Sequence, residues 1–189
     1  MSRGFTLIEL MIVIAIIAII AAIAVPNLIS ARLSSNETAA VATLRTIITA
    51  QSQFQTTARA DENLNGLGEY GTFGEMSASV GVRGGARLSL PVISTAFRAV
   101  NASGQVPRSG YLFAIYLPDA AGDPVPEDAN GGMSAGQVDP ALAESTWCCY
   151  GWPGGFGSSG ARTFFVNQAG DIVQTLNSSY TGSGSGPGA

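Results

Sequence analysis

The feature that most constrains this chain is an uninterrupted apolar run near its amino terminus. No polar side chain occurs from Leu10 to Val25, and Pro26 follows directly. Counted from Phe5, the segment has about the 20 residues that a helix needs to cross the hydrocarbon core of a bilayer. One carboxylate, Glu9, lies near its start. Because a charge within such a span costs about 2.5–3.5 kcal/mol on the insertion scale, we expect Glu9 to have a functional role.

A short motif begins this run. Residues 4–10 read Gly-Phe-Thr-Leu-Ile-Glu-Leu, and an Ile/Ala-rich stretch then leads to Val-Pro-Asn at residues 25–27. The pattern resembles the amino terminus of type IV pilins and of the related type II secretion pseudopilins. The resemblance implies that residues 1–4 are a leader peptide, and that a prepilin peptidase cleaves after Gly4 and methylates the new amino terminus, Phe5. It also implies that Glu9 guides docking into a growing filament.

The role that the resemblance gives to Glu9 has a physical basis. Cleavage after Gly4 leaves a free ammonium group on Phe5, one helical turn before Glu9. In lipid, each charge is costly alone and much less costly when paired. An incoming subunit can therefore set its ammonium group against a neighbour's Glu9, which fixes the axial register of the two helices. The alternative is that Glu9 only caps its own helix, since carboxylates are favoured near a helix amino terminus.

An ordinary secretory signal peptide is the rival interpretation of this segment. Ala22-Ile23-Ala24 fits the A-x-A pattern of a cleavage site, which would leave Val25 as the first residue. The apolar run is longer than the 7–15 residues of a typical signal core, and it carries Glu9 near its start. Both features favour the pilin-like interpretation. Arg3 favours an amino terminus that stays in the cytoplasm.

Composition removes several classes of activity. The 189 residues contain no histidine, which excludes Ser-His-Asp and Cys-His catalysis and the usual zinc and haem ligand sets. Charged residues make up 12% of the chain and the net charge is −4, so we expect no nucleic acid partner. The sequence predicts a protein that is not an enzyme and that has no cofactor, apart from the calcium site considered below.

Apolar spacing predicts one long helix over residues 5–58, of which 5–26 form the transmembrane segment. The resemblance implies that residues 5–26 are also the filament core. Beyond Pro26, apolar residues recur at three- and four-residue spacings, which is typical of an amphipathic helix. Pro26 has no N–H and disfavours helical geometry at the preceding residue, so we expect a local break there.

Strand signals predict a globular head over residues 59–176. We assign strands to residues 111–117, 145–152, 163–167 and 171–176. An antiparallel sheet laid on the amphipathic half-helix buries the apolar faces of both. The predicted fold class is therefore α+β, with a long N-terminal helix packed on a small antiparallel sheet, as in pilins. The Gly/Ser-rich residues 177–189 are expected to form a flexible tail.

The segment after the helix resembles the first half of a calcium-binding loop. Its spacing is D-x-N-x-N-G, but the acid expected six residues after the glycine falls on Thr72, with Glu69 or Glu75 as candidate replacements. The candidate calcium ligands are Asp61, Asn63, Asn65 and Glu69. The alternative, which we favour, is a polar turn rich in Asn and Gly.

Two further groups of residues leave alternatives open. Cys148 and Cys149 are adjacent, so they form a strained vicinal disulfide, two buried thiols or an intersubunit bridge. Residues 119–140 contain five carboxylates that suggest acid–base chemistry, but we expect a solvated surface loop. These are Asp119, Asp123, Glu127, Asp128 and Asp139.

The leading functional hypothesis is a structural subunit that polymerises with identical subunits through its N-terminal helix into a type IV pilus-like filament. Its other expected partners are the prepilin peptidase and the pilus or secretion assembly machinery. Before assembly the chain would lie in the bacterial inner membrane as a single-pass protein with a cytoplasmic amino terminus. The alternatives are a pseudopilin that acts in type II protein export, and an enzyme or binding module tethered by a signal anchor.

Overall fold

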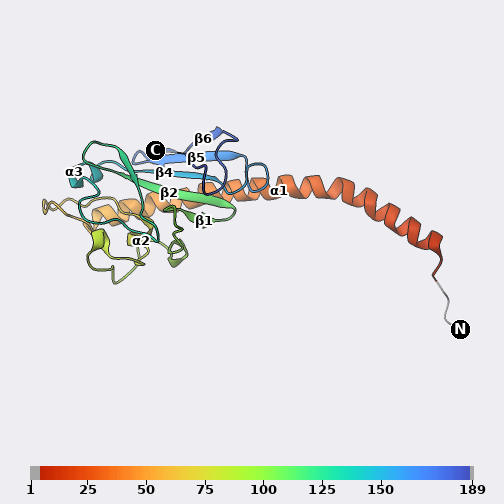
Figure 1. Ribbon diagram of the computed structural model, residues 1–189, viewed down its shortest axis with the longest axis horizontal. Helices are drawn as coiled ribbons and strands as arrows, with labels where there is room; N and C mark the ends of the chain where they lie inside the picture. The colour runs from red at the N-terminus through yellow and green to blue at the C-terminus, as the bar shows by residue number, and fades with distance from the viewer. Residues whose placement is uncertain (1–4, 188–189) are drawn as a thin grey trace.

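The computed structural model describes residues 5–187 and consists of a long helix with a head on its carboxy-terminal half (Figure 1). Helix α1 spans Leu7–Thr56, slightly less than the 5–58 expected from the sequence. The head contains two further helices, two single 3-10 turns and six strands. The helices are α2 (Phe73–Met76) and α3 (Pro140–Ala143), and the 3-10 turns are Val82–Gly84 and Thr95–Phe97.

The six strands form one antiparallel sheet. Their order is β1-β2-β4-β5-β6, and β3 pairs with the distal end of β2. The strands are β1 (Val106–Arg108), β2 (Tyr111–Pro118), β3 (Pro124–Pro126), β4 (Cys148–Pro153), β5 (Arg162–Asn167) and β6 (Val173–Leu176). The predicted α+β class, with a long helix on a small antiparallel sheet, is confirmed. Strands β1 and β3 were not expected from the sequence.

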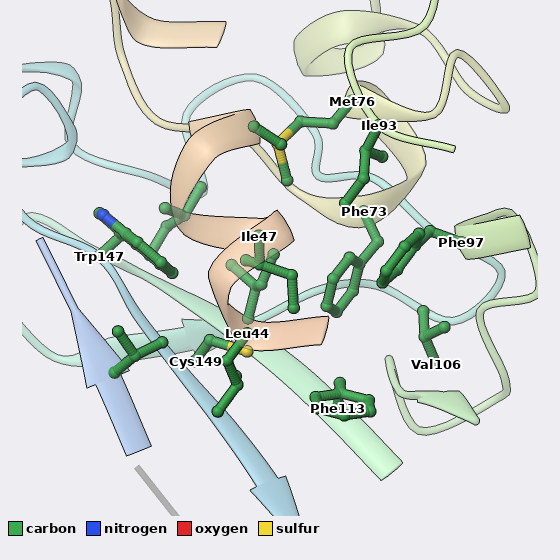
Figure 2. Packing of buried hydrophobic residues seen from close by; sticks show 14 of the residues in the cluster. Leu44, Ile47, Phe73, Met76, Ile93, Phe97, Val106, Phe113, Trp147 and Cys149 are labelled. Atoms are coloured by element: carbon green, nitrogen blue, oxygen red, sulfur yellow. The ribbon is translucent and has the colours of Figure 1, made fainter. Parts of the chain in front are cut away.

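The main core lies between the second half of α1 (residues 33–56) and one face of the sheet. Leu44 and Ile47 of α1 are fully buried, and they face side chains of the sheet and of the segment 57–105 that follows the helix (Figure 2). Phe73 and Phe97 stack in this core at a centroid distance of 5.5 Å. The amphipathic half of the helix therefore covers the sheet, as its apolar spacing predicts.

One polar side chain of α1 is also buried in this core. The Gln51 amide donates from Nε2 to the Gly71 carbonyl (2.7 Å) and accepts at Oε1 from the Gly71 N–H (2.9 Å). Both polar groups of the Gly71 backbone are satisfied in this way, so the chain can lie against the helix at this residue.

The helix does not break at Pro26. It is continuous from Leu7 to Thr56, and it curves gently in its first half (Figure 1). Proline leaves the carbonyl of Ala22 without its usual helical partner, but alanine and leucine residues close to it favour the helix. The predicted local break is therefore absent from the isolated chain.

The carboxy-terminal segment also differs from the prediction. In place of a free tail, residues 177–187 lie on the sheet face that points away from α1. There Trp152 donates from Nε1 to the Gly182 carbonyl (2.9 Å), and Tyr116 donates from its hydroxyl to the Pro187 carbonyl (3.2 Å). These contacts cover a second apolar cluster that contains Leu112, Ala114 and the fully buried Trp152.

Candidate functional site

The first half of α1 (residues 7–32) exposes an apolar surface. Apart from the half-buried Ala21, every residue from 5 to 32 is exposed, and Phe5 retains 77% of its accessible surface. The helix is long and apolar enough to cross a membrane by length and composition, and none of its most apolar window is buried against the head. Exposed apolar surface on this scale marks a membrane or protein contact.

Glu9 lies at the beginning of this helix and closes a capping box. Its carboxylate accepts hydrogen bonds from the Thr6 N–H (2.8 Å) and the Thr6 hydroxyl (2.6 Å), and the Glu9 N–H donates to that hydroxyl (3.3 Å). The capping interaction is thus present in the isolated chain. It leaves carboxylate lone pairs for another donor, so a role in docking stays a prediction. Gly4, the expected cleavage position, lies outside the described residues.

The second half of α1 is fixed to the loop between β4 and β5 by polar contacts. Asn36 donates from Nδ2 to the Ser159 carbonyl (2.8 Å), and Glu37 accepts at Oε1 from the Ala161 N–H (3.0 Å). The Glu37 carboxylate also lies 3.6 Å from Nε of Arg162 on β5. These contacts mark the point along α1 at which the head begins.

The loop at residues 61–66 forms polar turns. Asp61 accepts at its two carboxylate oxygens from the N–H groups of Asn65 and Gly66, both at 3.1 Å. The side-chain amides of Asn63 and Asn65 donate to Glu144 Oε1, each at 2.8 Å. Among residues 5–187 no group of three or more acidic or thiol side chains has the arrangement of a metal site. The geometry agrees with the polar-turn alternative.

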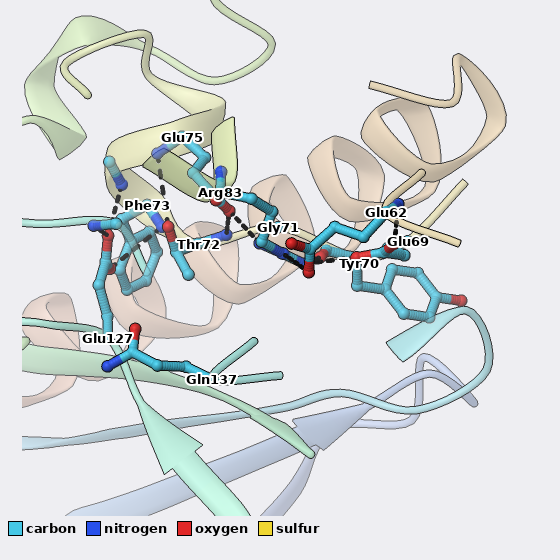
Figure 3. Close-up of polar contacts among 12 residues, drawn as sticks. Glu62, Glu69, Tyr70, Gly71, Thr72, Phe73, Glu75, Arg83, Glu127 and Gln137 are labelled. Carbon is cyan, nitrogen blue, oxygen red and sulfur yellow. Dashed lines mark hydrogen bonds and ion pairs between the residues drawn. The ribbon is translucent and has the colours of Figure 1, made fainter. Parts of the chain in front are cut away.

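Glu69, the expected fourth calcium ligand, lies in a buried network that the sequence did not predict, and its carboxylate accepts from the Glu62 N–H at 2.7 Å (Figure 3). Arg83 lies at its centre, with guanidinium nitrogens 2.6 Å from Glu75 Oε2, 3.2 Å from Glu69 Oε2 and 3.7 Å from Glu62 Oε2. The side chains of Glu69 and Glu75 are completely buried. Arg83 stabilises them by charge pairing. A calcium site that includes Glu69 stays a prediction.

The acidic segment 119–140 is not a uniformly solvated loop. Glu127 is buried, and its carboxylate accepts from the N–H groups of Phe73 (3.1 Å), Gly74 (2.6 Å) and Gly132 (2.7 Å) (Figure 3). Burial raises the pKa of Glu127 to about 7, against the opposing effect of these backbone hydrogen bonds. The expectation of a solvated loop is therefore wrong for Glu127, which ties this segment to the amino end of α2.

The adjacent cysteines are both free thiols. They lie on β4, where neighbouring side chains point to opposite faces, so Cys149 is buried in the main core and Cys148 is half-buried on the other face. Burial raises the pKa of Cys148 to about 11 and raises the pKa of Cys149 as well, which keeps both protonated at neutral pH. Of the three alternatives, the structure shows two thiols that are not bonded to each other.

The amino-terminal segment and most of the remainder of the chain each match a known protein family. Residues 1–25 match a family described as the prokaryotic N-terminal methylation motif, and residues 21–178 match a family described as a protein of unknown function, DUF2950. No solved structure matches.

Two curated proteins are similar in sequence. The type IV major pilin protein PilA of Myxococcus xanthus is 35% identical over 155 residues, which cover 78% of this chain and 70% of the relative. The type IV wide pilus major component PilA4 of Thermus thermophilus is 52% identical over 54 residues, which cover 29% of this chain and 41% of the relative. The chain belongs to the type IV pilin family, and over residues 21–178 also to the DUF2950 family.

Proposed function

We propose that this pilin is a non-enzymatic structural subunit that polymerises through the first half of α1 into a type IV pilus-like surface filament. The observation that carries the proposal is the exposed apolar surface of residues 7–32 on a helix whose other half is fixed in the head. Both similar proteins are named as major components of type IV pili, which favours a pilus subunit over a secretion pseudopilin.

The surface of this half-helix requires two environments in succession. A helix with exposed apolar side chains is stable in a bilayer. Before assembly the subunit is a single-pass inner-membrane protein with its amino terminus in the cytoplasm. It leaves the lipid when the same side chains are covered by the corresponding helices of other copies. Interaction with an assembly machinery would accompany this transfer.

Processing prepares the amino terminus for that step. The match to the N-terminal methylation motif supports cleavage after Gly4 and methylation of Phe5 by a prepilin peptidase. Sequencing of the mature protein tests this step directly. A chain that begins at Phe5 supports the proposal, whereas a chain that begins at Val25 would identify a signal peptide.

Glu9 then sets the register between subunits. Its carboxylate is oriented by Thr6 at the start of α1, and it is exposed where the Phe5 ammonium group of a neighbouring copy would dock. Pairing of the two charges inside the apolar bundle lowers the cost of burying either one. The capping contact with Thr6 and the docking contact with a neighbour use different lone pairs of the carboxylate.

The Glu9→Gln variant tests this role, since it removes the charge but keeps an oxygen that can accept from Thr6. We expect this variant to accumulate in the membrane at the wild-type level and to form no filaments in sheared-cell preparations. Thr6→Val is the matched control, because it removes the hydroxyl contact and keeps the Glu9 charge, and it should assemble. Normal filaments from Glu9→Gln, or their loss from Thr6→Val alone, would contradict the register role.

A further inference from the structure

The edges of the sheet differ in how they are protected. Strand β1 has three residues and contains a proline and an arginine, and β3 also has three residues, of which two are prolines. Short length, proline and charge are the usual ways in which an edge strand avoids pairing with other chains. Strand β6, at the edge away from β1 (Figure 1), reads Val-Gln-Thr-Leu and has neither proline nor charge.

All four residues of β6 are exposed, and they divide between the two faces of the sheet. Leu176 pairs with Arg162, whose side chain reaches α1, so Leu176 lies on the face that carries the helix. Val173 pairs with Phe165 and lies on the opposite face. Leu176 is 72% exposed and Val173 is 56% exposed. The helix side of β6 thus presents a large apolar side chain that nothing in residues 5–187 covers.

Arg162 holds this part of β6 beside α1. Its Nε lies 3.6 Å from Glu37 Oε2 on the helix, and its Nη1 donates to Gln174 Oε1 on β6 at 3.3 Å. A shallow hollow of about 210 Å³ lies here. It is lined by Arg162, Gln174, Thr175 and Leu176. The exposed strand and Arg162 therefore form one continuous surface that contains this hollow.

This surface adjoins the apolar half of the helix. Ile29, which is still about half-exposed, precedes Glu37 by eight residues, or about 12 Å along the helix axis. A copy of the chain that covers the helix near Ile29 would come close to Arg162 and Leu176. The established family membership makes other copies of this chain the available occupant, because pilins assemble into polymers of subunits.

We propose that the helix-side face of β6, formed by Gln174 and Leu176 beside Arg162, packs against a second copy of this chain in the filament. The inference rests on the proposed polymerisation and adds a contact between heads to the contact between helices. Contacts between subunits of an open filament are heterologous, so a different surface of the neighbouring head would occupy the hollow.

The test compares two substitutions on the same strand, made in the full-length chain and expressed in cells. Leu176→Glu places a charge in the proposed interface, and Val173→Glu places the same charge on the opposite face as the matched control. We expect Leu176→Glu to reduce the amount of sheared filament by at least about tenfold, equivalent to about 1.4 kcal/mol. Val173→Glu should reduce it less than about twofold, in keeping with a surface substitution.

Two outcomes would overturn the proposal: wild-type assembly of Leu176→Glu, or an equal loss of filaments in Val173→Glu. If Leu176→Glu fails to accumulate in the membrane, Leu176→Gln, which has a similar length and no charge, takes its place with the same expected direction. The Glu9→Gln variant separates this inference from the proposed function. Loss of filaments in Glu9→Gln with normal filaments in Leu176→Glu would reject only the head contact, whereas normal filaments in Glu9→Gln would reject the register mechanism instead.

Discussion

The two halves of α1 are one continuous helix with different partners. Residues 33–56 bury their apolar stripe against the sheet, whereas residues 7–32 lie outside the head and have only apolar side chains from Leu10 to Val25. The second half has polar residues on its free side, and it behaves as a helix of a globular domain. The first half is stable only in lipid or among other helices. One helix therefore joins a folded head to a surface that has to be completed by other molecules.

The largest expected effect comes from the same substitution made in each half. Ile47→Ala leaves a cavity in the core and should lower the free energy of unfolding of the head by about 2–5 kcal/mol. Ile17→Ala shortens an exposed side chain and should change the free energy of unfolding by less than about 0.5 kcal/mol. Denaturant unfolding of the detergent-solubilised chain, followed by tryptophan fluorescence, measures both. Equal losses would show that the first half also packs on the head.

A smaller effect concerns pH, which should act on the head through Glu127. Its folded pKa of about 7 lies above the ordinary value of 4.5, so the folded state binds the proton more tightly than the unfolded state. The proton that Glu127 binds in the folded state stabilises the head fully below about pH 4.5. This stabilisation, about 3 kcal/mol at most, is lost as the pH rises through 7. The Glu127→Gln side chain does not titrate, so the free energy of unfolding of this variant lacks the pH-dependent contribution.

Unfolding free energies of the wild-type chain and Glu127→Gln, compared at pH 5 and pH 8, test this expectation. The advantage of the wild-type chain should be larger at pH 5. A larger advantage at pH 8 would mean that the three backbone hydrogen bonds stabilise the charged form more than burial opposes it. Membrane insertion through the first half of α1 should be the same for both chains, which keeps the effect within the head.

The smallest effect is expected from calcium. Because Glu69 pairs with Arg83, adding calcium or a chelator should shift the melting temperature of the head by less than about 2 °C, or about 1 kcal/mol. A larger increase with calcium that disappears in Asp61→Ala would restore the calcium site as an explanation for this loop.

The sequence predicted the parts of the fold that depend on local pattern. The apolar run and the three- and four-residue spacing predicted α1, and aromatic and β-branched residues predicted β2, β5 and β6. Strands β1 and β3 were missed because each has three residues and contains proline, so their pairing with β2 depends on tertiary contacts. Pro26 shows the opposite case, in which a local rule predicted a break and the strong helical context of its neighbours prevailed.

The residues whose surroundings the sequence did not reveal are those that contact distant segments. Glu69 turns inward because Arg83, fourteen residues further on, offers a buried cation. Glu127 is buried because the N–H groups of α2 and Gly132 accommodate its carboxylate. Residues 177–187 read as a flexible tail by composition, but Trp152 provides an apolar surface and an N–H that needs an acceptor. None of these partners could be identified from spacing alone.

The most direct test of the central claim is electron cryomicroscopy of filaments sheared from cells that express this chain. The account predicts that residues 7–32 of neighbouring copies pack together along the filament axis, with each chain beginning at Phe5 and with Glu9 beside the amino terminus of another copy. A filament in which these residues lie on the outside, or from which they have been removed, would contradict it.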